Sequence, residues 1–260
     1  MGRTIKNNAV IDLHSHILPE MDDGSDSVDT SLKMLRVLDE GQVRVVCATS
    51  HYYRHREAVE DFVRRRQAAA GKLADRIDIT GEGDQYPQIR LGAEVAFFSS
   101  ISECARLDEL CIEGTRTLLL EMPFQRWTST EISEVLSLVL DRGLQIILAH
   151  PERYEFCSEN KRALRRLMDL PVGIQVNADT LLHFRSRRQG LKLLTDAVWP
   201  LLGSDAHNMS ARRPRLEEGR KSVVRHLGQE FLDQMDETAA WLLERQENAP
   251  RPPERQEDGD

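Results

Sequence analysis

The sequence has few cysteines, and none of them is arranged in a way that signals a disulfide framework or a thiolate zinc site. Its 260 residues include only Cys47, Cys104, Cys111 and Cys157, and no two of these form a Cys-x-x-Cys pair. Cys47 lies inside an apolar run and is expected to be a small core residue. A reducing, cytoplasmic setting is therefore expected.

Long apolar runs and an excess of positive charge are also lacking. No stretch is long enough to cross a bilayer, and the polar residues 1–8 are not followed by the apolar region of a signal peptide. Lysine and arginine number 35 against 43 acidic residues, so the net charge is −8. The basic runs at 64–66 and 185–188 are interpreted as solvated helix faces. We expect no membrane insertion and no nucleic-acid partner.

What the sequence does contain is a series of short apolar runs that alternate with helical patterns. The runs are continuously hydrophobic, which suits buried strands of a parallel sheet covered on both faces. Ile132, Val135 and Val139 follow helical spacing, and Gly143 is placed to end that helix. The alternation predicts a barrel-like α/β fold. The seven predicted strands are 10–13, 43–48, 89–91, 118–120, 146–149, 172–176 and 199–202.

No linker-like break interrupts the interior of the chain. Residues 1–245 are therefore expected to form a single domain. Residues 246–260 are polar, contain proline and show no apolar periodicity, so they are expected to be a disordered tail.

Side chains with metal-binding chemistry follow six of the seven apolar runs. In a parallel barrel the carboxyl ends of all strands lie on one rim, where active sites are found, so these segments are expected to converge. The sixth run ends on Asn177, which is a poor metal ligand. The residues that follow the other runs are His14 and His16, His51, Glu94, Glu121, His150, and Asp205 with His207.

The His14-Ser15-His16 segment is a weak signal alone, because two such histidines could equally be satisfied polar residues. Residues two apart on a strand share a face, so both imidazoles could bind one ion. Together with the acids at the other strand ends, they would be costly to bury without a cation. Imidazole and carboxylate ligands without thiolate favour manganese, iron or zinc. The ligands outnumber the needs of one ion, which indicates two or three, as in phosphoester hydrolysis.

Asp22-Asp23-Gly24 follows the histidine pair. Asp-Gly is a common turn pair, so the segment is either an ordinary turn or a turn that also supplies a ligand. The chemistry of the residues alone leaves both interpretations open.

As an ordered set, these motifs resemble the PHP (polymerase and histidinol phosphatase) superfamily of metal-dependent phosphoesterases. The segments IDLHSHILPEMDDG, ATSH, GAE, LLLEMP, AHPERY, QVNA and GSDAHN are similar to the manganese-type bacterial protein-tyrosine phosphatases of capsule and exopolysaccharide operons. The resemblance runs from about residue 10 to residue 213. It implies a distorted seven-stranded (β/α) barrel.

The resemblance also implies a set of metal ligands, with manganese as the expected ion and iron or zinc as alternatives. It favours Asp23 as a ligand. The implied ligands are His14, His16, Glu94 and Asp205 for a first ion; Glu94, Glu121 and His150 for a second; and Asp23, His51 and His207 for a third.

Two arginines would bind the phosphate by the same resemblance. They are Arg153 and Arg212, with Arg213 or Arg215 as alternatives to Arg212. A guanidinium offers a bidentate fork to phosphate oxygens.

The implied reaction is hydrolysis of phosphotyrosine on a protein, with an autophosphorylating tyrosine kinase of capsule or exopolysaccharide synthesis as the partner. A hydroxide bridging two metals would attack phosphorus in line with the departing oxygen. His207 or a metal-bound water could act as the acid. A covalent cysteine mechanism is excluded, because no cysteine here is followed by arginine six positions later.

Three other functions remain as alternatives. The first is a PHP phosphatase of a small molecule, such as histidinol phosphate or a phosphorylated sugar, which would use the same metals. The second is a nuclease-like protein, which the acidic net charge disfavours. The third is a non-catalytic, metal-stabilised binding domain, which the complete ligand set argues against. The sequence indicates no oligomeric state.

Overall fold

The computed structural model describes residues 9–81, 83–154 and 158–244, and the predicted tail at 246–260 lies outside them. Its strands form two sheets in which every paired strand is parallel to its neighbour. The first sheet has the order β1 (Val10–Ser15), β2 (Val43–Ala48), β4 (Gln88–Leu91). The second has the order β3 (His51–Tyr52), β5 (Glu94–Ala96), β6 (Thr117–Glu121), β7 (Gln145–Ala149), β8 (Val172–Asn177), β9 (Trp199–Gly203).

All seven predicted strands are present, and most are longer than predicted by one or two residues. The sequence did not predict β3 and β5, which follow β2 and β4 after breaks of two residues. At these breaks the chain crosses from the first sheet into the second. Both extra strands are short and begin on a polar residue, so no apolar pattern marks them.

The two sheets also approach each other at the far edge, where Ser15 of β1 forms an isolated bridge with Ala206 just after β9. Among the described residues this single bridge does not make a continuous ladder. The α/β fold with parallel strands is confirmed, and the distorted seven-stranded barrel stays a prediction.

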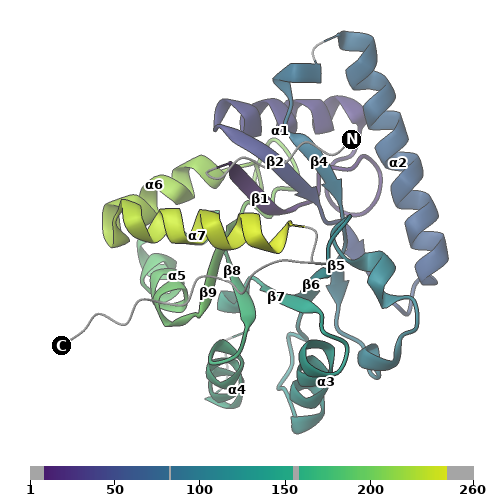
Figure 1. The fold of residues 1–260 in the computed structure, drawn as a ribbon. Helices are drawn as coiled ribbons and strands as arrows, with labels where there is room; N and C mark the ends of the chain where they lie inside the picture. Colours follow the sequence, from purple (N-terminus) through teal and green to yellow (C-terminus); the bar gives the residue numbers. More distant parts are fainter. Residues whose placement is uncertain (1–8, 82, 155–157, 245–260) are drawn as a thin grey trace.

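Strands of both sheets share an inner hydrophobic core. Helix α7 (Gln229–Leu242) lies across β1 and β9 and covers this core with Ala239 and Leu242 (Figure 1). The strand residues that face it include Ile11, Leu13, Val45, Cys47, Leu119, Ile147 and Leu201.

The other faces of the strands pack against helices in a larger, outer core. The predicted helical stripe of Ile132, Val135 and Val139 lies in a helix, although that helix ends at Leu140, three residues before Gly143. Among the described residues, no helix is long and apolar enough to cross a bilayer. The remaining helices are α1 (Val28–Glu40), α2 (Val59–Thr80), α3 (Ser129–Leu140), α4 (Ser158–Met168), α5 (Phe184–Asp196) and α6 (Leu216–Leu227).

Helix α2 corrects one prediction about the basic run at 64–66. Arg64 is exposed, but Arg66 is buried and donates hydrogen bonds to the carbonyl oxygens of Gly92 and Glu109. Arg66 lies four residues after buried Phe62, on the inward face of the helix. The solvated-face interpretation is therefore wrong for Arg66, which instead ties α2 to the segment that leads into β5.

Because α7 covers the inner core, we expect truncation of a buried side chain on this helix to destabilise the protein. Leu242 has 0% exposure, so Leu242→Ala should lower the free energy of unfolding by about 2–5 kcal/mol through lost burial and a cavity. Urea denaturation followed by circular dichroism measures this change. The control is Leu140→Ala, because Leu140 is 70% exposed and its truncation should change stability by no more than about 0.5 kcal/mol. Equal losses in the two variants would contradict the role assigned to α7.

Candidate metal centre

The carboxylate of Glu94 lies at the centre of a cluster of histidines at the carboxyl ends of the strands. Its Oε2 atom is 3.3 Å from His14 Nε2, 3.2 Å from His16 Nε2 and 2.9 Å from His51 Nδ1. Its Oε1 atom is 2.8 Å from His150 Nε2. Burial alone would raise the pKa of Glu94, but the charge on His14 and the hydrogen bonds from these imidazoles hold that pKa well below its usual range.

Asp205 completes a group with the histidine pair. Its Oδ1 atom is 3.4 Å from His14 Nε2 and 3.5 Å from His16 Nε2. The two Nε2 atoms are themselves only 3.1 Å apart. The β1–β2 register is irregular between Asp12 and Ser15, yet the two imidazoles still converge as predicted.

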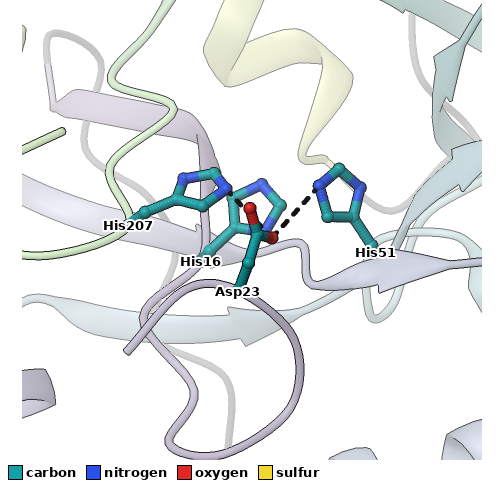
Figure 2. A group of neighbouring side chains, drawn as sticks. All are labelled: His16, Asp23, His51 and His207. Atoms are coloured by element: carbon teal, nitrogen blue, oxygen red, sulfur yellow. Dashed lines mark ion pairs between the residues drawn. The ribbon is translucent and has the colours of Figure 1, made fainter. Parts of the chain in front are cut away.

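A second group lies beside the first and contains His16, Asp23, His51 and His207 (Figure 2). Asp23 Oδ1 is 3.6 Å from His51 Nε2 and 3.5 Å from His207 Nε2. The Asp23 side chain is 65% exposed, whereas His16 and His207 are buried. Asp23 therefore closes the cluster from the solvent side.

Glu121 brings a second carboxylate close to Glu94. Its Oε1 atom is 3.6 Å from His150 Nε2, and it forms a further group with His51 and Glu94. Burial and the negative charge of Glu94 raise the pKa of Glu121 to about 7. The two buried carboxylates have ligand atoms within 4.8 Å of each other, which favours a cation between them.

All nine residues that the sequence singled out as ligands thus lie in overlapping groups, in which the ligand atoms are within 4.8 Å of one another. Three buried atoms in these groups have no partner in hydrogen-bonding geometry among the described residues, although the first two lie 2.9 Å from each other: Glu94 Oε2, His51 Nδ1 and His207 Nε2. These atoms have lone pairs that a cation would take. The donor set of imidazole and carboxylate fits manganese, iron or zinc. The division of the nine residues among three ions stays a prediction.

Asp22 is a contributor that the sequence did not identify. Its Oδ2 atom accepts hydrogen bonds from His16 Nδ1 and from the backbone N–H of His51, both at 2.7 Å. The second hydrogen bond of a ligating imidazole fixes its tautomer and orientation. The pKa of Asp22 is held well below its usual range, because the bonds and charge of His16 outweigh burial. The Asp-Asp-Gly segment is therefore both a turn and part of the cluster.

Gly24 permits this turn to pack against the histidines. A Cβ atom at position 24 would lie 2.5 Å from both Cβ and the carbonyl oxygen of His16. No side chain fits at that distance, so glycine is required here.

Two side-chain amides on β8 link His14 to Asp205. His14 Nδ1 is 2.8 Å from Gln175 Oε1, Gln175 Nε2 donates to Asn177 Oδ1 at 2.9 Å, and Asn177 Nδ2 donates to Asp205 Oδ2 at 2.7 Å. This orientation leaves His14 Nε2 directed at the cluster. Asn177 is a poor ligand, as the sequence suggested, but it orients Asp205.

The backbone at two of the clustered residues is in the left-handed region. His150 has φ 33° and Asp205 has φ 49°, and neither is a glycine. Such conformations are sparsely populated and concentrate at functional sites. His150 directly follows β7 and Asp205 lies two residues after the end of β9, and at each position the backbone aims the side chain into the cluster.

The two predicted phosphate-binding arginines lie at the rim of the cluster. Arg153 Nη2 is 2.9 Å from Asp205 Oδ2, and Arg212 Nη2 is 2.9 Å from each oxygen of the same carboxylate. The alternatives to Arg212 form ion pairs elsewhere, Arg213 with Glu218 and Arg215 with Asp179. Position 212 is therefore the one that faces the cluster.

A cavity of about 410 Å³ opens above these groups, and we refer to it as the first cavity. Its lining combines ionic side chains with an aromatic and apolar set. The residues that line it are His51, Glu121, Arg153, Arg212, Tyr53, Phe97, Phe124, Ala96, Met122 and Pro123.

The described cysteines take no part in this site. Cys47 and Cys111 are buried, and burial raises the pKa of the Cys111 thiol to about 12 and that of Cys47 well above its usual range. Thiols so hard to ionise are poor nucleophiles. Cys157 lies outside the described residues.

Comparison with known proteins places this site in a family context. The family described as "Capsular polysaccharide synthesis, CpsB/CapC" matches residues 10–241. The chain belongs to this family. The match spans both sheets and every residue of the cluster, which agrees with the resemblance noted from the motifs.

Individual family members are similar over nearly their whole length. The tyrosine-protein phosphatase CpsB of Streptococcus agalactiae is 27% identical over 237 residues, covering 87% of this chain and 94% of that protein. The tyrosine-protein phosphatase YwqE of Bacillus subtilis is 26% identical over 250 residues, covering 94% and 96%.

Solved structures show the same relationship. One solved structure superposes on this chain with a TM-score of 0.79. It comes from work on YwqE from Bacillus subtilis and CpsB from Streptococcus pneumoniae, which are described there as unique metal-dependent tyrosine phosphatases. It is 26% identical, and the match covers 94% of this chain and 98% of that one. The phosphotriesterase homology protein from Escherichia coli shares the fold alone, with a TM-score of 0.52 at 14% identity over 92% of this chain and 100% of its own.

The protonation of the cluster predicts how metal binding depends on pH. Burial lowers the pKa of His16, but its bonds to Asp22 and Glu94 outweigh burial and raise that pKa to about 10, while Glu121 titrates near 7. A cation needs both groups deprotonated, so binding should release protons and weaken as the pH falls from 8 to 6. Titration calorimetry in buffers of different ionisation enthalpy measures both effects. Binding without proton release and with constant affinity would contradict this protonation pattern.

The side-chain amides of Gln175 and Asn177 are not predicted ligands, yet we expect them to affect metal affinity by orienting His14 and Asp205. Gln175→Leu removes the acceptor of His14 Nδ1 and should weaken metal binding by about 10- to 100-fold. Competition with a chelator of known affinity measures the change. Gln234→Leu, at an exposed position on α7, is the matched control and should bind metal as the wild type does. Unchanged affinity in the Gln175 variant would exclude an orienting role for the amides.

Proposed function

We propose that this protein is a metal-dependent phosphatase that hydrolyses phosphotyrosine on proteins. The observation that carries the proposal is the first cavity, which combines residues of the candidate metal centre, two arginines and an aromatic wall. Phosphotyrosine has a dianionic phosphate on a phenyl ring, so it needs a cationic floor and an apolar wall in one pocket. The activity named for the two relatives supports the same substrate class.

The wall of the cavity favours phosphotyrosine over a small polar phosphoester. Tyr53, Phe97 and Phe124 present rings, and Met122 and Pro123 add apolar surface. Aromatic pairs gain stability beyond the area that they bury. Histidinol phosphate, the main alternative, carries an imidazole and an ammonium group, to which Phe97, Phe124, Met122 and Pro123 offer no side-chain acceptor.

Divalent cations bound at the cluster would activate water as a nucleophile and neutralise charge on the phosphoryl oxygens. Arg153 and Arg212 would add their guanidinium forks to the same oxygens. Both arginines pair with Asp205 in the structure, so they lie at the edge of the cluster, facing the cavity. The phenolate that leaves has a pKa of about 10, which makes it a better leaving group than an alkoxide.

His207 fits the role of ligand better than that of acid. Burial and the charge of His16 lower its pKa to about 3, so its imidazole is neutral at neutral pH. Its Nδ1 atom lies 2.9 Å from the carbonyl oxygen of Asp205, which leaves Nε2 directed at Asp23. A neutral imidazole whose proton is on Nδ1 is a suitable metal ligand through Nε2 but has no proton on Nε2 to give.

The remaining assignments extend this proposal. We infer a single domain over residues 1–245 with the form of a distorted seven-stranded barrel, manganese as the ion, and a cytoplasmic location. The proposed substrate is an autophosphorylating tyrosine kinase of capsule or exopolysaccharide synthesis, and the family context supports that setting.

The proposal predicts a substrate preference that depends on metal. Protein freed of metal with a chelator should be inactive. Manganese should restore turnover of a phosphotyrosine peptide well above that of a phosphoserine peptide or histidinol phosphate, because only the first offers an apolar phenyl ring to the aromatic wall. Released phosphate is the readout. His14→Ala/His16→Ala should abolish this turnover by removing two ligands of one group.

The control variant is His183→Ala, since His183 is exposed and pairs with Asp179 away from the cluster. It should keep the wild-type rate. A preference for histidinol phosphate would keep the metal chemistry and reject the substrate, whereas metal binding without hydrolysis of any of the three would favour the non-catalytic alternative.

A further inference from the structure

A second cavity of about 360 Å³ lies beside the first, and His51 and Tyr53 line both. Its other lining residues come from the loop that holds Asp22 and Asp23, from the segment between β3 and α2, and from α2 itself, which supplies Arg65. A substrate whose phosphotyrosine fills the first cavity would therefore place neighbouring groups at the second. The remaining lining residues are Met21, Asp22, Asp23, Arg56, Glu57 and Arg65.

Nearly every charge on the wall of this second cavity already has a partner within the protein. Asp22 accepts from His16 and two backbone N–H groups. Arg65 forms two hydrogen bonds with the carboxylate of Glu57, at 3.1 and 2.6 Å. Asp23 faces His51, His207 and Arg212.

Arg56 is the exception. Within the described residues, its guanidinium forms no ion pair, and it lies over the ring of Tyr53 with its central carbon 4.4 Å from the ring centroid. The Tyr53 ring in turn stacks on His51, with centroids 5.2 Å apart and an angle of 29° between the planes. A backbone hydrogen bond of 2.9 Å from Arg56 N to Tyr53 O fixes the turn. The Tyr53 ring thus lies between His51 of the candidate metal centre and the guanidinium of Arg56, which has no ion-pair partner among the described residues.

We propose that the second cavity is a subsite for an acidic side chain of the protein substrate, with Arg56 pairing its carboxylate. This inference rests on the proposed phosphotyrosine activity. Residues of an extended chain are spaced about 3.4 Å apart, so a side chain within one or two positions of the phosphotyrosine would reach a cavity that shares a wall with the first. The stacked guanidinium keeps its N–H groups free at the ring edge for such a carboxylate.

The test compares two phosphotyrosine peptides that differ only in whether the residues next to the phosphotyrosine are glutamate or glutamine. The wild type should show a kcat/KM about three- to fivefold higher for the glutamate peptide, as expected for one exposed ion pair. This ratio should fall towards one at high salt. Arg56→Gln should bring the ratio to one at low salt, and Arg56→Glu should invert it.

Arg54→Gln is the matched control, because it removes the same charge from the same loop at a residue that does not line the cavity. It should keep the wild-type ratio. A wild-type ratio of one, or an equal drop in the Arg54 and Arg56 variants, would overturn the subsite while leaving the phosphatase activity in place. Failure to hydrolyse either peptide or p-nitrophenyl phosphate would instead overturn the proposed function, and the subsite with it.

Discussion

The burial of Glu94 among four imidazoles is the constraint on which the rest of this structure depends. A carboxylate and several histidines taken out of water are costly to hold together, and neighbouring Glu121 adds like charge. The surrounding chain is built to hold them nonetheless. Asp22 and the β8 amides orient the rings, Gly24 lets the loop approach closely, and two ligand candidates accept left-handed backbone. Cations at the cluster would relieve the repulsion that this packing sustains.

The sequence revealed the strands and the site for the same physical reason. Continuous apolar runs mark strands buried on both faces, and a polar residue at the end of each run marks the rim. This was sufficient to find seven of the strands and eight of the nine clustered residues, whereas Asp23 lies in a loop and was favoured only by the family resemblance. The sequence did not predict β3 and β5, because a strand of two or three residues is too short to show an apolar periodicity. The sequence did not predict the roles of Asp22 and Gln175, because these residues act through contacts in the folded chain. Gln175 forms a hydrogen bond with a histidine 161 positions away. Arg66 was misjudged because its run of arginines crosses from the exposed to the buried face of one helix turn.

The two cavities share a wall because of the place where the chain crosses from one sheet to the other. The break after β2 leads at once into His51 and Tyr53, which belong to both cavity walls. Most of the candidate metal ligands thus lie on the buried rim, whereas the groups that would distinguish one substrate from another stand on the outer loops. Such an arrangement lets a family retain its ligands while its members differ in the surrounding rings and charges.

The bridge between Ser15 and Ala206 has a consequence for how this protein becomes a catalyst. It joins the first strand to the segment after the last, and beside it the backbone N–H of Asp205 donates a hydrogen bond to the carbonyl oxygen of His14. The candidate ligands on either side are separated by most of the chain, so the cluster forms only after the loops between them have closed. Ions that bind the completed cluster stabilise the native fold by mass action. Metal occupancy is thus coupled to the closing of the two sheets, and a chain that has not finished folding has no assembled centre with which to attack a phosphoester.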